Sequence, residues 1–390
     1  MCHLACRPIG LRDAQLADHR RREIAQAVGY RQSMRVLHLG YNIASQLSVS
    51  VRALHKIGIP ARGIAEVWEG VQMQSHDDVD VLPPIPPSRS LKWASVLVHR
   101  AAQIAAAIIW ADVLHWHFGH VFLPRHLDLR WTRLLHKPGV AEFWGSDIRT
   151  SETDAIDNPY FSYLPEGYRA ERSVGKSVQT QARFAALGFE CVIPALDFVP
   201  YIRKDLFPAV HFVRQRLLLE ELTPAYPDPR RRRIVIAHSP SSPLLKGTSF
   251  VLAAVDALSR EYDIELSLIH KVPHAEALQR VAMADIFIDQ MLLGGPGLAA
   301  LEAMALGKPV ICYIKPSMVG QYPLEMPIVN ASIDVLAGTL QGLVEDGVRR
   351  HQLGRAGRAY VEKYHDAVAL ARQLESIYRG LLDKRFVRVT

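Results

Sequence analysis

The strongest constraint in this sequence is a pattern of continuous apolar strands that alternate with helical segments and occur in two successive series. Strands of this kind are typical of parallel sheets covered by helices on both faces, because both sides of each strand are then buried. The pattern predicts an α/β protein with two doubly wound, Rossmann-like parallel-sheet domains. The expected strands are 35–40, 57–65, 112–118 and 139–144 in the first series, and 233–238, 264–270, 285–290 and 309–314 in the second.

The length of the chain agrees with two domains. Of its 390 residues 49% are hydrophobic, and a single core rarely grows beyond about 300 residues. We assign 34–205 to a first domain and 233–365 to a second, with a Pro- and Arg-rich linker over 206–232. Residues 366–390 are expected to form a helix that packs back on the first domain. We interpret the Arg-rich residues 1–33 as an N-terminal tail outside the fold.

The charge balance favours an acidic partner but does not identify it. Lys and Arg total 46 against 39 Asp and Glu, an excess of 7, which suits a phosphate-bearing ligand or an acidic membrane surface. The arginine run 230–233 is interpreted as a solvated part of the linker. We expect no nucleic-acid partner, because the sequence lacks a basic surface interleaved with aromatic residues.

The cysteines and the apolar runs indicate the compartment. Cys2, Cys6, Cys191 and Cys312 are spaced neither as a disulfide framework nor as a zinc site. The apolar run 101–111 is shorter than the roughly 20 residues that span a bilayer, and the first residues do not resemble a secretory signal. We therefore expect a cytoplasmic protein, with peripheral contact at the inner face of the membrane compatible with its basic charge.

Ligands of open parallel sheets bind beyond the carboxyl ends of the strands, where loops meet helix N-termini that attract anions. After the strand 233–238 the loop SPSSPLLKGT places Lys246 just before a helix that Thr248 could cap. Lys246 there could neutralise a phosphate. The alternative interpretation is an exposed lysine in a loop.

The loop after the strand 285–290 is the most informative segment of the chain. Gly294, Gly295 and Gly297 allow a close approach of the backbone to a ligand, and Glu302 lies about one turn into the following helix. A carboxylate at that place could accept hydrogen bonds from two adjacent hydroxyl groups of a ribose. The alternative is a tight turn followed by a solvated glutamate.

Polar side chains also end two strands of the first series. His115, His117 and His120 form the segment HWHFGH, and the first two share one strand face. They could hold a metal ion, end a strand structurally, or bind an acceptor or donor sugar. Asp147 and Arg149 could cap a helix or bind an acceptor, and we expect Asp147 to face a cleft.

Four segments together resemble the nucleotide-sugar glycosyltransferases of the GT-B fold, in a divergent subgroup of the glycosyltransferase family 4 type. The resemblance covers most of residues 34–382 and is weaker over 155–225. The segments are GLAALEAMALGKPVI, like the family's C-terminal signature, IVIAHSPSSPLLKGT, like its donor-phosphate loop, EFWGSDIR, like its acceptor-side Gly-Ser-Asp segment, and LGRAGRAYVEKYHD, like its closing helix.

The resemblance implies two domains that face a cleft and transfer an α-linked sugar with retention, without a metal ion or other cofactor. Lys246 would stabilise the leaving diphosphate, and Glu302 would hold the ribose of the donor. The catalytic residues implied are Lys246, His117 and Asp147. The donor-binding residues implied are His238, Ser241, Lys246, Gly247, Asp289, Gln290, Gly295, Gly297, Leu298 and Glu302.

The sequence departs from the family pattern at three positions. Gly294 stands where the family commonly has a sugar-contacting glutamate, Ser241 where it has an arginine, and Trp144 where a histidine precedes Gly-Ser-Asp. His238 could supply a donor in place of the arginine. Asp289 and Gln290 could compensate for the glutamate.

The function implied is the transfer of a sugar from a nucleotide-sugar donor to a saccharide or lipid-linked acceptor, in the synthesis of a cell-surface polysaccharide or glycoconjugate. Three alternatives stay open. They are a sugar-nucleotide epimerase of the same fold, a binding or scaffold protein that has lost catalysis, and a metal-dependent hydrolase that uses the histidines of HWHFGH.

Overall fold

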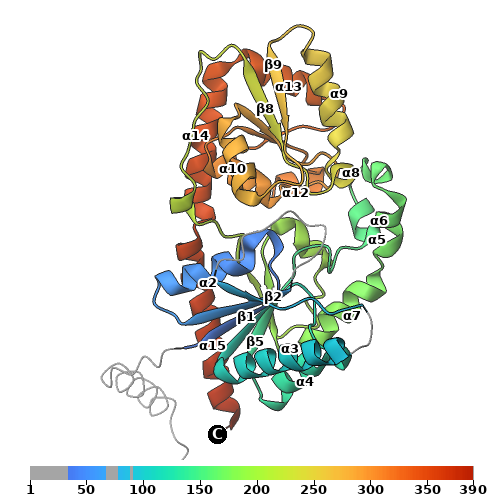
Figure 1. Cartoon of the computed structure of the whole chain (residues 1–390). Helices are drawn as coiled ribbons and strands as arrows, with labels where there is room; N and C mark the ends of the chain where they lie inside the picture. The colour runs from blue at the N-terminus through green and yellow to red at the C-terminus, as the bar shows by residue number, and fades with distance from the viewer. Residues whose placement is uncertain (1–33, 67–77, 88–90, 390) are drawn as a thin grey trace, which may run out of the picture. The chain divides into compact units, whose positions relative to one another are not determined.

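The computed structural model describes residues 34–66, 78–87 and 91–389. The expected tail 1–33, with Cys2 and Cys6, lies outside the described residues. The described residues from Arg35 onward group into one compact unit, which contains two parallel sheets with helices around them (Figure 1). The predicted α/β class with two doubly wound sheets is therefore confirmed.

The first sheet has seven parallel strands in the order β3-β2-β1-β4-β5-β6-β7. Every pairing in this sheet is parallel. Parallel strands need long crossover connections, and the helices between successive strands supply most of them. The strands are β1 (Val36–Tyr41), β2 (Ala61–Glu66), β3 (Val79–Val81), β4 (Val113–His117), β5 (Gly139–Glu142), β6 (Glu190–Ile193) and β7 (Val210–Phe212). The helices along this part are α2 (Gln46–Lys56), α3 (Leu91–Trp110), α4 (Leu127–Leu134), α5 (Ser151–Ala155), α6 (Glu166–Glu171) and α7 (Val174–Ala185).

The second sheet has five parallel strands in the order β12-β11-β10-β8-β9. Its strands are β8 (Ile234–His238), β9 (Ile264–Leu268), β10 (Ile286–Ile288), β11 (Val310–Cys312) and β12 (Val329–Asn330). The helices are α8 (Pro243–Lys246), α9 (Thr248–Leu258), α10 (His274–Met283), α11 (Leu298–Ala305), α12 (Pro316–Val319), α13 (Leu336–Glu345), α14 (Gly347–Tyr364) and α15 (Ala367–Val389). Short 3-10 helices are η1 (Ile43–Ser45), η2 (Pro124–His126), η3 (Phe161–Tyr163), η4 (Leu196–Tyr201) and η5 (Leu219–Glu221).

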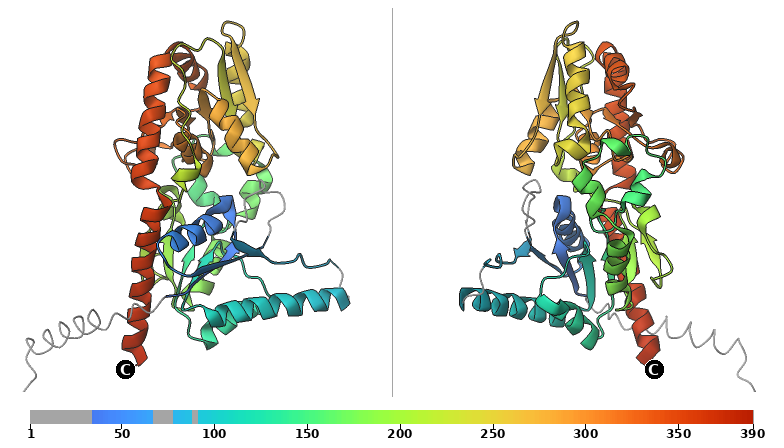
Figure 2. Two further views of the ribbon diagram at one scale, coloured as in Figure 1. Left: turned by 60° about the vertical axis from the view of Figure 1, so that its left-hand side comes forward. Right: turned by 90° about the vertical axis from the view of Figure 1, so that its right-hand side faces the viewer.

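Side chains of the central strands alternate between the two faces of the first sheet, as the pleat requires. Leu37, Leu39, Leu114 and Trp116 join one core with buried side chains of α3, α4 and α7. The intervening residues of β1 and β4 point to the other face, where α2 and α15 pack. Figure 2 shows α2 and α3 on opposite faces of this sheet. The alternation explains why the histidines of β1 and β4 gather on the α2 side.

The sequence pattern and the structure differ in several places. The strands β3, β6, β7 and β12 are not among the expected ones. β7 pairs with β6 and lies inside the range 206–232 that we assign to the linker. The sequence does not reveal this strand because three residues are too few to show an apolar pattern. All but the last residue of the apolar run 101–111 lies in the 20-residue helix α3, which is long and apolar enough to cross a membrane by length and composition only. The helix is longer than the run because it begins ten residues earlier, at Leu91.

The chain passes from the first sheet to the second and returns. Leu217 lies on the outgoing passage and donates its N–H to the carbonyl of His365, 2.8 Å away. Ala367, on the returning passage, donates to the carbonyl of Leu217 at 2.9 Å. The two passages are thus bonded side by side, and α15 then contacts α2 and β4.

Gly40 allows β1 and β4 to approach at the edge where the site lies. Its φ is +133°, and a Cβ atom there would stand 1.8 Å from the carbonyl oxygen of His117. We expect Gly40→Ala to lower the free energy of unfolding by about 2–4 kcal/mol, because backbone must move and a left-handed φ is strained. Chemical denaturation monitored by tryptophan fluorescence measures this loss.

Gly58→Ala is the matched control. Gly58 also has a positive φ of +78°, but no atom lies within 4 Å of the added Cβ. Its cost should be limited to the left-handed backbone, about 1–2 kcal/mol. Equal losses in the two variants would show that the contact between β1 and β4 is not close.

Candidate functional site

The loops after β8 and β10 meet, because these strands are neighbours in the second sheet and end at the same level. Lys246, the last residue of α8, places its Nζ 2.7 Å from Oδ1 of Asp289. The other carboxylate oxygen of Asp289 accepts the N–H of Gly297, the N-cap of α11, at 2.6 Å. The structure thus gathers a lysine, a carboxylate and a helix N-terminus, which is an arrangement suited to an anion.

Two glycines make this approach possible. Gly247 has a φ of +71°, and a Cβ at this position would stand 3.1 Å from Cβ of Met291. A Cβ on Gly297 would stand 2.9 Å from Nζ of Lys246 and 3.2 Å from Oδ2 of Asp289. A side chain at Gly297 would therefore displace the lysine from the start of α11.

Glu302 lies one turn into α11 and forms an ion pair with His274. Its Oε1 is 2.7 Å from Nε2 of His274, the first residue of α10. This hydrogen bond raises the pKa of His274 against the opposing effect of burial. Both side chains line a pocket of about 450 Å³ that is also bordered by Gln46, Arg52 and Arg216. Glu302 therefore faces a pocket and is not a solvated helix residue.

His238 does not have the role that the resemblance implies. It is buried, its Nδ1 donates to the carbonyl of Ile288 at 2.8 Å, and its Nε2 lies 2.9 Å from Oγ1 of Thr248. Burial lowers the pKa of His238 to about 4, so the ring is neutral and Nε2 accepts from the threonine. His238 has no N–H left for a phosphate. Thr248 is correspondingly not the cap of α9, whose N-cap is Gly247.

The other donor-binding residues inferred from the sequence lie around this centre. Ser241 is exposed in the loop after β8, and Leu298 is the half-buried first residue of α11. Gln290 is buried beside Asp289, and its carbonyl accepts the N–H of Tyr313 at 3.0 Å. A Cβ on Gly295 would stand 3.2 Å from Cβ of Asp197, which belongs to the first series of elements.

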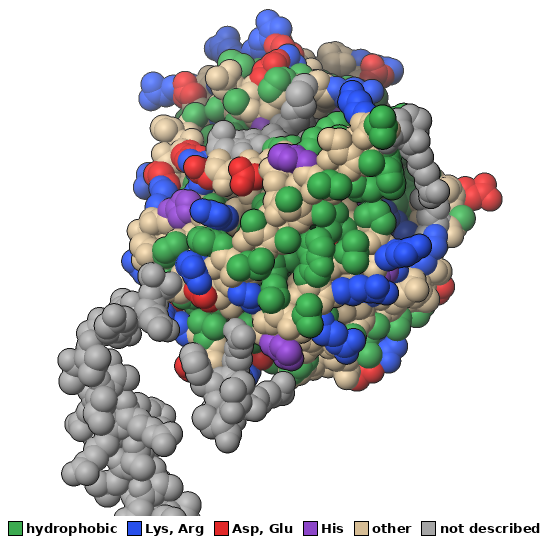
Figure 3. Space-filling model, turned by 60° about the horizontal axis from the view of Figure 1, so that its bottom comes forward, with side chains coloured by type: hydrophobic (Ala, Val, Ile, Leu, Met, Phe, Trp, Pro, Cys, Tyr) green, Lys and Arg blue, Asp and Glu red, His purple; other side chains and the backbone are tan. Residues whose placement is uncertain are grey.

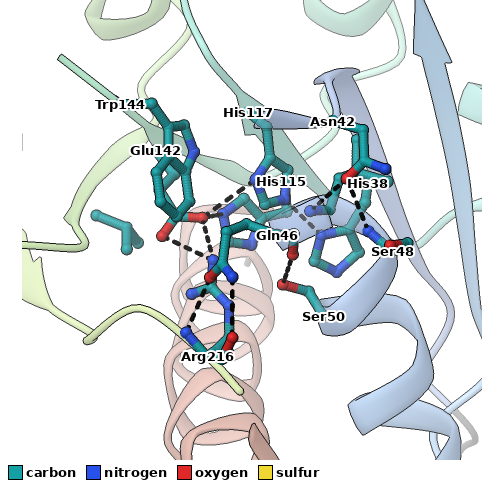
Figure 4. Close-up of polar contacts among 12 residues, drawn as sticks. His38, Asn42, Gln46, Ser48, Ser50, His115, His117, Glu142, Trp144 and Arg216 are labelled. Atoms are coloured by element: carbon teal, nitrogen blue, oxygen red, sulfur yellow. Dashed lines mark hydrogen bonds and ion pairs between the residues drawn. The ribbon is translucent and has the colours of Figure 1, made fainter. Parts of the chain in front are cut away.

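A second polar cluster lies at the carboxyl ends of β1, β4 and β5 in the first sheet (Figure 4). His38 pairs in register with His115, and His117 pairs with Glu142. Nδ1 of His38 is 2.8 Å from Nε2 of His117, and Oε2 of Glu142 is 3.1 Å from Nε2 of His115 and 3.2 Å from Nδ1 of His117. The strands therefore bring three histidines and one carboxylate together.

Arg216 completes this cluster from the passage that follows β7. Its Nη2 contacts both carboxylate oxygens of Glu142, at 2.9 and 2.8 Å. The backbone of Arg216 exchanges two hydrogen bonds with the side-chain amide of Gln46, which begins α2 (Figure 4). From α15, the Tyr378 hydroxyl lies 2.5 Å from Nδ1 of His115. Four separate segments are thus tied to Glu142.

The protonation of the cluster follows from its burial. Burial lowers the pKa of His38 and His117 well below the usual range, and the nearby charges of His115 and Arg216 lower it further. Burial would raise the pKa of Glu142, but the charge of Arg216 and the hydrogen bond from His115 lower it overall. At neutral pH the cluster contains one carboxylate, one guanidinium and neutral imidazoles.

His117 is therefore not placed as a catalytic residue. Its side chain is fully buried and its ring nitrogens face His38 and Glu142. A catalytic group must touch the substrate, and His117 has no exposed surface from which to do so. Side chains along β4 alternate between the two faces of the sheet, and this places His117 among buried side chains. That position does not fit the catalytic role inferred from the resemblance.

His38, His115 and His117 have ligand atoms within 4.8 Å of one another, a spacing that a metal ion could use. The hydrogen bonds of the cluster explain the close spacing of these histidines without a metal ion. His38 and His117 bond to each other, and the carboxylate nearest to them is already neutralised by Arg216. A divalent cation there would meet the positive charge of the arginine.

Asp147 lies beside a surface pocket of about 280 Å³ that His120, Arg149 and Lys176 also line. Its carboxylate accepts the N–H of Trp144 and the N–H of Gly119, each at 3.0 Å, and so ties the loop after β5 to the loop after β4. Burial raises the pKa of Asp147 to about 6, despite these N–H groups.

Neither Asp147 nor Arg149 caps the helix that follows. Thr150 is the N-cap of α5, and its Oγ1 accepts the N–H of Thr153. Arg149 instead donates from Nη2 to Asp197 at 2.7 Å and lies 3.4 Å from Asp154. It is thereby held among the elements of the first sheet.

Several residues of the two clusters have no assigned role in the sequence analysis. They are His38, Glu142, Arg216, His274 and Tyr378. One signal exists in the sequence, a glutamate inside the apolar strand 139–144, because a buried charge requires a partner. The identity of that partner is set by packing between segments that are distant in the chain.

The two parallel sheets, each with helices on both faces, have the architecture of the GT-B fold. No known protein-family profile matches this sequence, and no curated protein matches it. Solved structures do match it, among them a sucrose-phosphate synthase and a glycosyltransferase.

Three of these structures illustrate the likeness. Sucrose-phosphate synthase from Thermosynechococcus elongatus is 15% identical, with 90% of this chain and 100% of that chain covered and a TM-score of 0.60. HepE from Anabaena, in complex with UDP and glucose, is 12% identical, with coverages of 89% and 100% and a TM-score of 0.55. WaaG, a glycosyltransferase involved in lipopolysaccharide biosynthesis, is 12% identical, with coverages of 88% and 100% and a TM-score of 0.57. Identities this low show the fold alone.

We expect the protein to lose stability in acid because it buries neutral histidines. The pKa of His238 is lowered to about 4, and those of His38 and His117 are also lowered. The unfolded chain binds protons below about pH 6.5, whereas the folded chain does so only at lower pH, so this stability is present above pH 6.5 and is lost as the pH falls. His238 alone should contribute a loss of about 3 kcal/mol by pH 4.

Urea denaturation at a series of pH values between 7 and about 4 measures this loss. The variant His238→Gln keeps a donor for the carbonyl of Ile288 and should show a shallower dependence on pH. A dependence as steep as that of the original chain would contradict the role of His238.

Removal of the Glu142 charge should be strongly destabilising. Glu142→Gln leaves the buried guanidinium of Arg216 without a counter-charge, and breaking a buried pair in this way costs about 3–5 kcal/mol. The double variant Glu142→Leu with Arg216→Met, which removes both charges, should recover part of the loss in urea denaturation.

A chelator supplies the control for a metal ion in the same cluster. Because hydrogen bonds and Arg216 account for the histidines, we expect the denaturation midpoint to be the same with and without a chelator. A lower midpoint with the chelator, together with zinc in the purified protein, would mean that the histidines bind a metal ion.

Proposed function

We propose that this chain is a retaining, metal-independent glycosyltransferase that moves a sugar from a nucleotide-sugar donor to a saccharide or lipid-linked acceptor. Its product would belong to a cell-surface polysaccharide or glycoconjugate, made in the cytoplasm or at the inner face of the membrane. The observation that carries the proposal is the group formed by Lys246, Asp289 and Gly297 at the start of α11, with Glu302 on the same helix.

The diphosphate of the donor fits the start of α11. The first N–H groups of a helix have no partner within the helix and attract negative charge. Lys246 lies 2.7 Å from Asp289 and 12% of its side chain is exposed, so its ammonium group can contact both the aspartate and an arriving phosphate. As the bond to the sugar breaks, charge grows on the phosphate oxygen, and the ammonium group stabilises it without a metal ion.

The ribose of the donor fits Glu302. One carboxylate oxygen accepts from His274, and the other is available to accept from the vicinal hydroxyl groups of a ribose. His274 fixes the rotamer of Glu302 and, when protonated, holds its charge in place. Lys246 stands at the start of α11, beside its N-cap Gly297, and Glu302 lies about one turn into the same helix. A diphosphate joined to a ribose would contact the first group with its phosphates and the second with its sugar.

The donor most strongly supported for a first test is a UDP-sugar. The fold resembles that of HepE, which is described in complex with UDP-glucose. The acceptor would contact the first sheet, where Asp147, with a pKa raised to about 6, lines the pocket of about 280 Å³. A carboxyl group of that pKa can exchange a proton with a sugar hydroxyl near neutral pH.

We expect Lys246→Ala and Glu302→Gln each to weaken the binding of the cognate nucleotide by at least about tenfold. Each removes a charge-assisted hydrogen bond, which contributes about 1.5–3 kcal/mol. Calorimetric titration of the purified protein with UDP, GDP, ADP and their sugar conjugates identifies the nucleotide and measures both losses.

Two further variants make the test specific. Lys204→Ala removes an exposed lysine of the first sheet region and should leave nucleotide binding unchanged. Lys246→Met with Asp289→Asn removes both charges of the pair and so avoids an unpaired buried carboxylate, yet it should still bind the nucleotide weakly. Unchanged binding in Lys246→Ala and Glu302→Gln would refute the donor site.

A binding protein without catalysis is the second candidate. It is favoured by Gly294, where no side chain is available to contact the donor sugar, and by Asp289, which already neutralises Lys246. Release of nucleotide from the sugar conjugate in the presence of a chelator separates the two candidates. Saturable binding without release would support the binding protein, and release with retained configuration would support the transferase.

A further inference from the structure

A large apolar surface lies on α3 and α4, on the side of the first sheet opposite α2. We call it the α3–α4 face and define it by exposed hydrophobic side chains. Figure 3 views this side of the molecule and shows hydrophobic side chains across its centre. The members are Leu91, Ala94, Val98, Ala102, Ala106 and Ile109 of α3, and Leu127, Leu134 and Leu135 of α4 and the residue after it.

In the α3–α4 face, the exposed apolar side chains of α3 lie along one side of the helix, and the opposite side of the helix packs on the core. Leu91 is 92% exposed, Val98 70% and Ile109 61%, and they recur at helical spacing. On the other side of the same helix, Ile104, Ala107 and Ile108 are buried in the core of the first sheet. Only 22% of the most apolar window of α3 is buried.

The helix cannot cross a bilayer in this structure, although its length and composition would allow it. To do so it would have to withdraw Ile104 and Ile108 from the core, which would expose the sheet beneath them. An apolar stripe on a helix that stays folded on its sheet is suited to lie in the plane of a membrane surface. An exposed apolar patch of this kind indicates an interaction site.

The charges that α3, α4 and the segment between them expose are mainly positive. Outside this stretch, the exposed Asp80 of β3 lines a hollow together with Ala106. The stretch 91–137, all of which the structure describes, contains two carboxylates, Asp112 and Asp128. Asp112 is bound by Arg35, with 2.9 Å between Nη2 and Oδ1. Asp128 is fully buried and accepts the N–H groups of Phe122 and Leu129. The Asp128 carboxylate is thus away from the surface, and the partly exposed Asp112 is paired with an arginine.

The exposed basic side chains of the same stretch are Lys92, Arg125, Arg130 and Arg133. In Figure 3 Lys and Arg side chains lie along the border of the apolar area. A basic border around an apolar centre complements a bilayer that contains anionic lipid, because apolar side chains enter the headgroup region while cations contact phosphates.

We propose that the α3–α4 face docks on the surface of a membrane that contains anionic phospholipid, with α3 in the plane of the interface. A second copy of the chain is a poorer occupant, because a two-fold contact through this face would bring the two basic borders against each other. The docking rests on the surface of the first sheet alone and does not depend on the sugar-transfer activity.

The test is the co-sedimentation of the full chain with two kinds of vesicle, phosphatidylcholine alone and phosphatidylcholine mixed with phosphatidylglycerol. We expect binding to the mixed vesicles and at least about tenfold less to phosphatidylcholine alone, since each basic residue near the surface contributes about 1 kcal/mol. Binding to the mixed vesicles should weaken as salt is raised.

Val98→Glu should reduce the bound fraction about tenfold or more, because it replaces an exposed apolar side chain that would enter the headgroup region with a charge that anionic lipid repels. The matched control is Val348→Glu, the same substitution at a 58% exposed valine of α14, which should bind as the original chain does. Arg125→Gln with Arg130→Gln should lower binding to the mixed vesicles and reduce its salt dependence.

Each outcome decides the proposal. Vesicle binding lost in Val98→Glu and kept in Val348→Glu supports it. No binding of the original chain to mixed vesicles, or equal binding of the two valine variants, overturns it. A dimer in light scattering that Val98→Glu converts to a monomer, without vesicle binding, assigns the face to a second copy and also overturns it. Nucleotide binding by calorimetry, measured on the same variants, should be unchanged, so that a failure here is distinct from a failure of the donor site.

Discussion

Glu142 and Arg216 form a fully buried ion pair, and the carboxyl edge of the first sheet is arranged around it. An isolated charge in this place would cost several kcal/mol, so the fold must bring partners to both groups. It does so with His115 and His117 of β4, with Gln46 at the start of α2, and with the passage that follows β7. The interaction therefore fixes how the first sheet, its helix α2 and the chain leaving the sheet meet.

The second sheet also buries a carboxylate, but the partners of this carboxylate remain accessible to a ligand. Asp289 is also buried at the end of a strand, but its partners are a lysine that is partly exposed and the N–H at the start of a helix. Both partners prefer negative charge and both can accept a second anion. The difference in exposure between Lys246 and Arg216 separates a structural pair from a pair suited to binding.

The sequence predicts the two sheets because a parallel strand covered on both faces must be largely apolar, as 35–40 and 233–238 are. It does not reveal β7, since three residues are too short for a pattern. Lys246 and the glycines around 294–297 could be identified because loops after adjacent strands must meet.

The rest of the candidate site depends on packing that local pattern does not encode. Gln46 and Arg216 are 170 residues apart in the chain, and His274 reaches Glu302 only because α10 and α11 are neighbours. The misplaced residues, His117 and His238, are histidines at strand ends. Whether such a ring faces a pocket or the core depends on which face of the sheet is covered by helices, and here both rings face the core.

The two passages between the sheets are hydrogen-bonded to each other at Leu217, His365 and Ala367. A single crossing would let one sheet rotate about any axis relative to the other. Two crossings joined side by side behave as a leaf hinge, which bends about the line that runs through both and resists twisting out of that line. The paired crossings therefore restrict how the polar edges of the two sheets can move relative to each other more than a single crossing would.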